Sequence, residues 1–131
     1  MKSAASRVYL VAFAAAALAG CGGNPVYNVK NAPIDTPAGV TRTVPDVEKA
    51  IQGAGAQLGW KMQSPRPELI VAATSWRSHT ATVDITYDTK SYNIVYKDSV
   101  NLDYDGTSIH RNYNRRVEEL DRAIRARLAV F

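Results

Sequence analysis

Cys21 is the single cysteine among the side chains of this 131-residue sequence that could act as nucleophiles or metal ligands. A cysteine thiolate can form a disulfide, bind a metal, attack a substrate or take up a lipid. A single cysteine excludes a disulfide within the chain. The residues around Cys21 therefore decide which of the remaining reactions its sulfur is expected to perform.

Cys21 follows a segment with the features of an export signal. Lys2 and Arg7 precede an uncharged apolar run over residues 8–19, which is 12 residues long. A membrane-spanning helix needs about 20 such residues, so this run is too short to remain as a span. A basic start, a short apolar stretch and then small residues are typical of a cleavable signal peptide. We therefore expect residues 1–20 to be removed.

The sequence Leu18-Ala19-Gly20-Cys21 resembles the lipobox of bacterial lipoproteins. The resemblance implies that Cys21 becomes the new N-terminus, carries a diacylglyceryl group on its sulfur and is acylated on its amine. Two or more acyl chains anchor a protein stably to a bilayer. Gly22 stands where, in Gram-negative lipoproteins, an Asp favours retention at the inner membrane. The expected location is therefore the outer membrane, with the domain facing the periplasm. Display on the cell surface is the alternative location, and an ordinary signal peptide with an incidental cysteine is the alternative to lipidation.

Length and composition limit the number of domains and the classes of partner. Removal of residues 1–20 leaves 111 residues, the size of one domain, and lowers the formal net charge from +4 to +2. Nucleic-acid binding usually depends on a clustered basic face, so we expect no nucleic-acid partner. Acylation of Cys21 would leave no thiol for a metal site or for covalent catalysis.

Catalysis and metal binding find little support in the sequence. A zinc site needs three or four ligands, and the chain has two histidines, His79 and His110, with no third ligand specified. Ser75, Ser78 or Ser99 could pair with a histidine in principle, but no nucleophile elbow or other catalytic signature surrounds any of them. Asp84 and Asp88, four residues apart on a predicted strand, are too ordinary a pair to indicate glycoside hydrolysis. We therefore expect no enzymatic activity, no metal and no cofactor.

Polar side chains cluster at the expected start of the last helix, where residues 109–114 read Ile-His-Arg-Asn-Tyr-Asn. Free backbone amides there could hold a phosphate or carboxylate together with Arg111 and Arg115. Alternatively, these polar residues cap the helix and satisfy buried backbone groups, which is the interpretation we favour. The side chains concerned in that alternative are His110, Asn112 and Asn114.

The same segment carries a further resemblance. Residues 99–104 read Ser-Val-Asn-Leu-Asp-Tyr, and together with residues 109–114 they are similar to paired motifs in a family of small proteobacterial outer-membrane lipoproteins. The resemblance covers roughly residues 60–130 and implies no particular activity. The family has an aromatic residue soon after the position of Asn114, where this chain has Arg115 and Arg116, so a surface shared with the family would be altered here.

Hydrophobic periodicity predicts two helices and at least three strands. Apolar residues recur at helical spacing over residues 46–58 and 109–130. Apolar and polar residues alternate over residues 79–88, as in a strand with one covered face. Residues 68–76 and 92–96 are rich in the small apolar and β-branched residues of further strands.

Several boundaries stay open at this level. Residues 26–30 form either a short edge strand or more of a tether, and residues 100–104 form either a fourth strand or an extended segment under the last helix. Prolines and a serine predict a turn at residues 64–67. The expected helix N-caps are Thr43 or Asp46 for the first helix and Thr107 or Ser108 for the second.

This order predicts an α+β fold built as a two-layer sandwich. An antiparallel meander of three to four strands would have one helix before it and one after it, both on its apolar face. Residues 21–45 would form the lipidated N-terminus with a tether and loop, and residues 46–131 the α+β domain.

The expected function is that of a membrane-anchored periplasmic lipoprotein, a non-enzymatic binding or structural module with an envelope protein as partner. The alternative is a protein that binds a small ligand or a cell-wall glycan. Aromatic side chains among hydrogen-bonding groups suit either kind of contact. The candidate binding residues are Trp76, Thr82 and Asp84 on the sheet, and His110, Arg111, Asn112, Asn114 and Arg115 on the last helix.

Overall fold

The computed structural model describes residues 23–130. The expected signal peptide and the expected lipidation site, Cys21, lie outside the described residues. Across the described residues, no helix has the length and apolar character needed to cross a bilayer.

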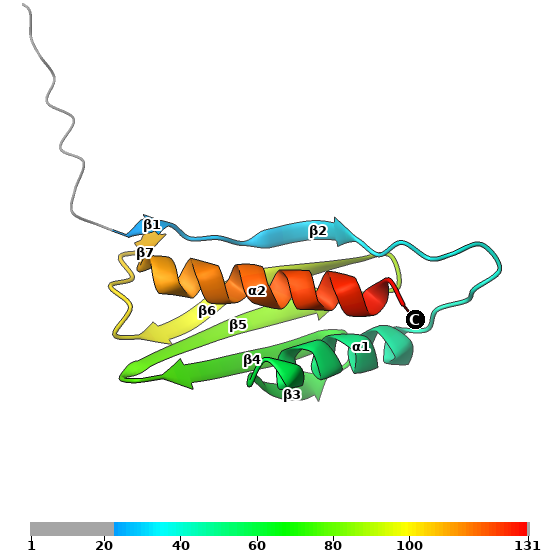
Figure 1. Cartoon of the computed structure of the whole chain (residues 1–131), viewed down its shortest axis with the longest axis horizontal. Coiled ribbons are helices and arrows are strands. Elements are labelled where there is room, and N and C mark those ends of the chain that lie inside the picture. The colour runs from blue at the N-terminus through cyan, green and yellow to red at the C-terminus, as the bar shows by residue number, and fades with distance from the viewer. Residues whose placement is uncertain (1–22, 131) are drawn as a thin grey trace, which may run out of the picture.

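The fold consists of two helices and a five-stranded antiparallel sheet with the strand order β2-β6-β5-β4-β3, together with a small sheet of β1 and β7 (Figure 1). The predicted α+β class, with one helix before and one helix after the β3–β6 meander, is confirmed. The elements are β1 (Asn24–Pro25), β2 (Val29–Pro33), α1 (Val44–Gln57), β3 (Lys61–Arg66), β4 (Leu69–Trp76), β5 (His79–Tyr87), β6 (Ser91–Val100), β7 (Ser108–Ile109) and α2 (Arg111–Leu128).

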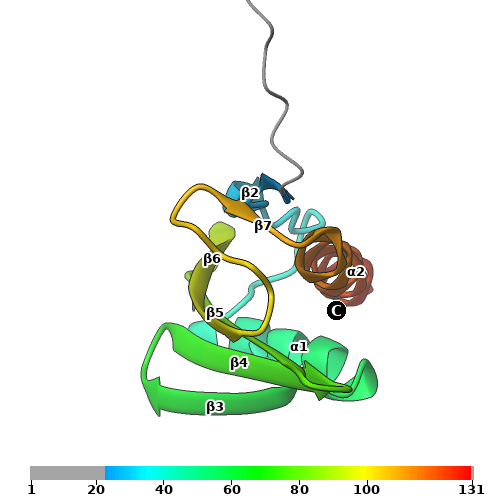
Figure 2. The same ribbon diagram turned by 90° about the vertical axis from the view of Figure 1, so that its left-hand side faces the viewer.

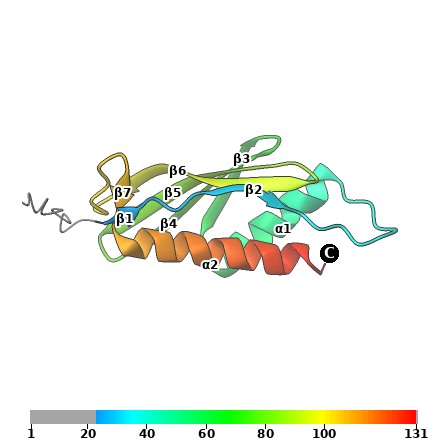
Figure 3. The same ribbon diagram turned by 90° about the horizontal axis from the view of Figure 1, so that it is seen from above.

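Alternation along the central strands divides the sheet into a covered and an open face. On β5, Ala81, Val83 and Ile85 are fully buried, whereas the residues between them keep part of their surface. The sheet curves around the two helices, which both lie on its concave side (Figure 2). Helix α2 runs along the length of the sheet, as the view from above shows (Figure 3). The covered face and the helices therefore share one core.

Each helix contributes an apolar stripe to this core. Val47 and Ile51 of α1 are fully buried, and so are Val117, Leu120 and Ile124 of α2. Burial of side chains of this size contributes about 1.5–3 kcal/mol each. The stripe on α2 is the one predicted from the spacing of apolar residues.

The predicted tether over residues 21–45 contributes two strands to the fold. β2 pairs with β6, and its residues Val29 and Ala32 are buried. This result agrees with the strand interpretation of residues 26–30, shifted toward the C-terminus. The packed unit therefore begins before residue 46, because these small apolar residues bury themselves at the edge of the sheet.

The turn predicted at residues 64–67 is wrong, because Lys61–Arg66 forms edge strand β3. Pro65 is tolerated there, since an edge strand has backbone positions that need no hydrogen-bonding partner. The pairing of β3 with β4 is interrupted between Gln63 and Arg66, around this proline. The chain turns instead at Pro67 and Glu68, where Glu68 adopts a left-handed backbone conformation with φ of 64°.

The N-cap of α1 is one of the residues predicted from the sequence, whereas the N-cap of α2 is not. Thr43 caps α1 and forms a reciprocal capping box with Asp46, as expected for one of the two candidates. The N-cap of α2 is His110 rather than Thr107 or Ser108. Those two residues instead donate their backbone N–H groups to the Asp105 carboxylate, which closes the preceding turn.

Candidate functional site

A polar cleft of about 420 Å³ lies between the β4–β5 turn and the first turns of α2. Figure 2 looks onto this end of the molecule. The cleft is lined by Trp76, Arg77, His79, Asn112, Arg115, Arg116 and Glu119. Three of the eight candidate binding residues, Trp76, Asn112 and Arg115, therefore meet here.

The tight β4–β5 turn positions one wall of the cleft. Trp76, the last residue of β4, pairs with His79, the first residue of β5, and Arg77 and Ser78 lie between them. Arg77 adopts a left-handed conformation with φ of 52°, which the reversal of the chain requires. The rings of Trp76 and His79 lie 5.4 Å apart between centroids.

Aromatic and cationic groups stack across the cleft. The guanidinium carbon of Arg116 lies 3.9 Å from the centroid of the Trp76 ring, a cation–π contact. The imidazole of His79 stacks on that of His110 at 6.3 Å between centroids. Arg116 and His110 belong to the α2 side, so these contacts join the hairpin to the helix.

Both histidines have one ring nitrogen committed to the backbone. His79 Nδ1 lies 2.6 Å from the carbonyl oxygen of Asn101, to which it donates a hydrogen bond. His110 Nδ1 accepts a hydrogen bond from the backbone N–H of Asn112 at 3.2 Å, as the cap of α2. These bonds fix the orientation of both rings.

The charge of the cleft comes from side chains more than from the helix end. The N–H of Asn112 is used by the His110 ring, and the N–H of Tyr113 by the His110 carbonyl. The lining residues include three guanidinium groups and a single carboxylate, that of Glu119. Guanidinium groups bind phosphate and carboxylate through paired hydrogen bonds, so an anionic group is the ligand that fits this lining.

Asn114 does not reach the cleft and holds the N-terminal segment instead. Its Oδ1 accepts a hydrogen bond from the N–H of Tyr27, and its Nδ2 donates to the carbonyl of Pro25, both at 2.9 Å. These bonds agree with the interpretation that polar residues here satisfy backbone groups of a neighbouring segment. The neighbouring His110 caps the helix, and Arg111 lies exposed at its first position.

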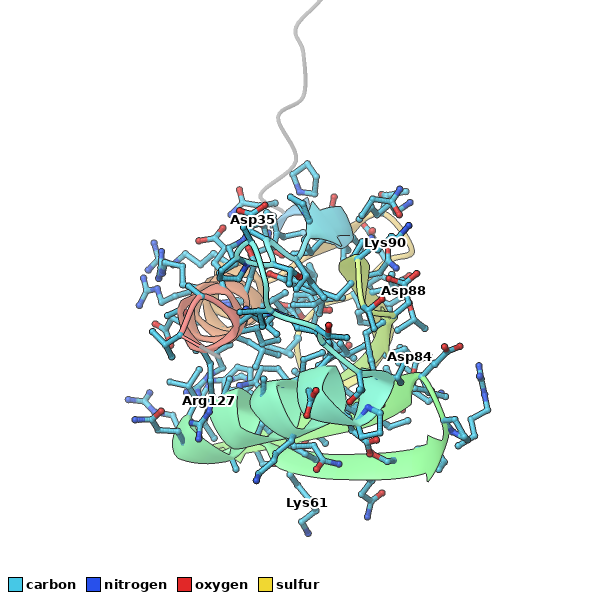
Figure 4. All side chains as sticks on the ribbon, turned by 90° about the vertical axis from the view of Figure 1, so that its right-hand side faces the viewer. Asp35, Lys61, Asp84, Asp88, Lys90 and Arg127 are labelled. Atoms are coloured by element: carbon cyan, nitrogen blue, oxygen red, sulfur yellow. The ribbon has the colours of Figure 1, made fainter. Side chains whose placement is uncertain are left out.

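Thr82 and Asp84 lie on the open face of the sheet and do not line the cleft. Figure 4 shows Asp84 on the side of the sheet away from the helices. The carboxylate of Asp84 forms an ion pair with Lys97 of β6 at 3.3 Å. The surface predicted from the sequence therefore divides into two separate regions.

Sequence reasoning left four cleft residues out of the candidate binding set. Arg77 and His79 belong to the β4–β5 turn, and Arg116 and Glu119 to α2. The closeness of Trp76 and Arg116, 40 residues apart in the chain, depends on the packing of α2. The short polar turn between two predicted strands was the one local signal that placed Arg77 and His79 at a hairpin end.

The described residues offer the cleft no metal site. Across residues 23–130, no three His, Cys, Asp or Glu side chains are grouped so that they could hold a metal ion. Comparison of the chain with protein-family models, with curated proteins and with solved structures found no match.

Proposed function

We propose that this chain is a lipid-anchored, non-enzymatic binding module of the bacterial cell envelope. Its anchor would be the acylated Cys21 in the outer membrane, and its domain would face the periplasm. The sequence of the lipobox supports the anchor. The observation that carries the role in protein binding is the partly exposed open face of the sheet, and the cleft of about 420 Å³ adds a surface for an anionic group.

The polar groups of the cleft are better suited to binding an anion than to catalysis. Arg77 and Arg115 are exposed and available to an anion, while Arg116 is engaged by the Trp76 ring. One ring nitrogen of His79 and one of His110 form hydrogen bonds with backbone groups. An anionic group bound here would lie beside the charged arginine side chains and the ring of Trp76.

A protein partner would meet the open face of the sheet. Across β4, β5 and β6, the paired residues Val71, Asp84 and Val95 form one row on this face. All three are partly exposed. A mixed apolar and polar composition of this kind is ordinary for a protein–protein interface.

Crosslinking in cells tests this proposal. A photoreactive residue at Thr82, on the open face, should give a discrete adduct with one envelope protein. The same residue at Gln57, exposed near the end of α1, serves as the matched control and should give none. Absence of an adduct from Thr82, together with retention of the protein on purified peptidoglycan, would contradict this proposal and favour the glycan-binding alternative.

A further inference from the structure

The point at which the chain enters the fold lies beside the cleft. Asn24 of β1 pairs with Ile109 of β7, which is three residues before Asn112 in the cleft. Asn114 fixes the same segment by its bond to Pro25. Figure 1 shows β1, β7, the β4–β5 turn and the start of α2 at one end of the elongated molecule.

The distance from this point to the proposed anchor is short. Cys21 precedes Gly23, the first described residue, by two positions. Each residue of an extended chain spans at most about 3.6 Å, so the two positions allow about 7 Å. If Cys21 is acylated, the end of the domain that carries the cleft therefore lies next to the lipid headgroups. This step rests on the proposed lipid anchor.

The side chains at this end match a phospholipid surface. Arg77 and Arg115 are exposed beside the cleft, and Arg111 is exposed at the first position of α2. Tyr104 is 42% exposed and stacks on Tyr96 at 4.0 Å between ring centroids. Arginine binds phosphate groups, and tyrosine and tryptophan favour the boundary between water and lipid.

The cleft lining keeps a positive balance despite acidic residues at this end. Asp105 accepts hydrogen bonds from the backbone N–H groups of Thr107 and Ser108, which lowers the pKa of its carboxyl group and keeps it ionised, but Asp105 does not line the cleft. Glu119 is the single carboxylate of the cleft lining. At the opposite end of the molecule, labelled in Figure 4, Asp35, Asp88 and Lys90 present charges of both signs.

We propose that this end of the domain docks on the membrane that holds its anchor, with phosphate groups of lipid headgroups bound by Arg77 and Arg115. Arg116 keeps Trp76 in place within the cleft through their cation–π contact. The two acyl attachments and the cleft would then hold the domain in one orientation. The open face of the sheet, which runs along the long axis, stays free for a partner protein.

Tryptophan fluorescence reports this orientation, because the chain contains two tryptophans in different surroundings. Trp60 is a core residue with 5% exposure, and Trp76 lines the cleft. The acylated full-length mature protein would be prepared as Trp60→Phe and as Trp76→Phe. Each variant is placed in vesicles of phosphatidylethanolamine and phosphatidylglycerol that contain a lipid with a nitroxide on its headgroup. We expect strong quenching of Trp76 and weak quenching of Trp60.

Charge variants connect the quenching to the arginines. In the Trp60→Phe background, Arg77→Gln with Arg115→Gln should weaken docking by about 25-fold, since each arginine near an anionic surface contributes about fivefold. Arg66→Gln with Arg122→Gln is the matched control, because it removes the same charge from exposed positions outside the cleft. The control should leave the quenching of Trp76 unchanged.

Two results would overturn the inference, and a mass measurement separates them from failure of the anchor. Quenching of Trp76 no stronger than that of Trp60 would show that this end does not face the lipid. Equal quenching of Trp76 in the cleft variant and in its Trp60→Phe parent would show that the arginines do not bind headgroups. An intact mass without acyl chains would contradict the proposed anchor itself, and with it the basis of the docking.

Discussion

Asn114→Ala tests how firmly α2 holds the N-terminal segment. The substitution removes two hydrogen bonds, from the N–H of Tyr27 and to the carbonyl of Pro25. Each bond between uncharged groups contributes about 1 kcal/mol, so their loss costs about 2 kcal/mol. Alanine recovers about 0.5 kcal/mol because it is the better helix former. We therefore expect the free energy of unfolding to fall by about 1.5 kcal/mol.

Urea denaturation and hydrogen exchange measure this effect. Asn112→Ala is the matched control, since it removes the same amide two residues earlier on α2, where the structure gives the side chain no hydrogen bond. Its free energy of unfolding should change by less than about 0.5 kcal/mol. The Tyr27 amide should lose its protection from exchange in the Asn114 variant and keep it in the control.

An unchanged exchange rate for the Tyr27 amide in Asn114→Ala would refute this reasoning. So would equal stability of the two variants. Either result would mean that the N-terminal segment is not held by α2. The short fixed connection between Cys21 and the cleft, on which the membrane orientation depends, would then lack its main support.

The remaining predictions concern buried tyrosines and one glycine. Tyr113→Phe should raise the free energy of unfolding by about 1 kcal/mol, because the buried Tyr113 hydroxyl has no hydrogen-bonding partner. Tyr92→Phe should lower it by about 1–3 kcal/mol, because Asp121 would lose the hydroxyl that donates to it at 2.5 Å. Thermal unfolding distinguishes the two variants, and equal shifts would contradict the assigned contacts. Burial and the charge of Glu48 raise the pKa of Tyr87 from 10.0 to about 12, so the folded state favours the neutral phenol. The protein should therefore lose stability as the pH rises from about 10 to about 12. Urea midpoints that stay constant over this range would contradict the prediction. Gly23→Ala would bring a methyl group into the backbone of β7, so it should detach β1; unchanged amide protection in β1 would contradict that contact.

Periodicity alone could predict the elements that have one face in the core. The alternation over residues 79–88 corresponds to β5, and the stripe on residues 109–130 to α2. These patterns are local, because each residue's burial follows from its position along one strand or helix. The fold class and the helix positions could therefore be predicted from the chain.

The parts that could not be predicted depend on contacts between distant segments. β3 contains Pro65, which argues for a turn unless its place at a sheet edge is known. Asn114 bonds to residues 87 and 89 positions away, and no local pattern indicates that pairing. The cleft likewise exists because α2 brings Arg116 over the Trp76 ring. Residue types alone could suggest an anion site on the last helix, but not its second wall.

The central claim is that this domain is held at a membrane through one sulfur atom. Intact mass spectrometry of the mature protein, isolated from cells after flotation of the membranes, tests this claim most directly. We predict a chain that begins at Cys21, carries a diacylglyceryl group and an amide-linked acyl chain, and floats with the outer membrane, while Cys21→Ser does not. A mature chain that begins at another residue, or one without acyl mass, would contradict the account.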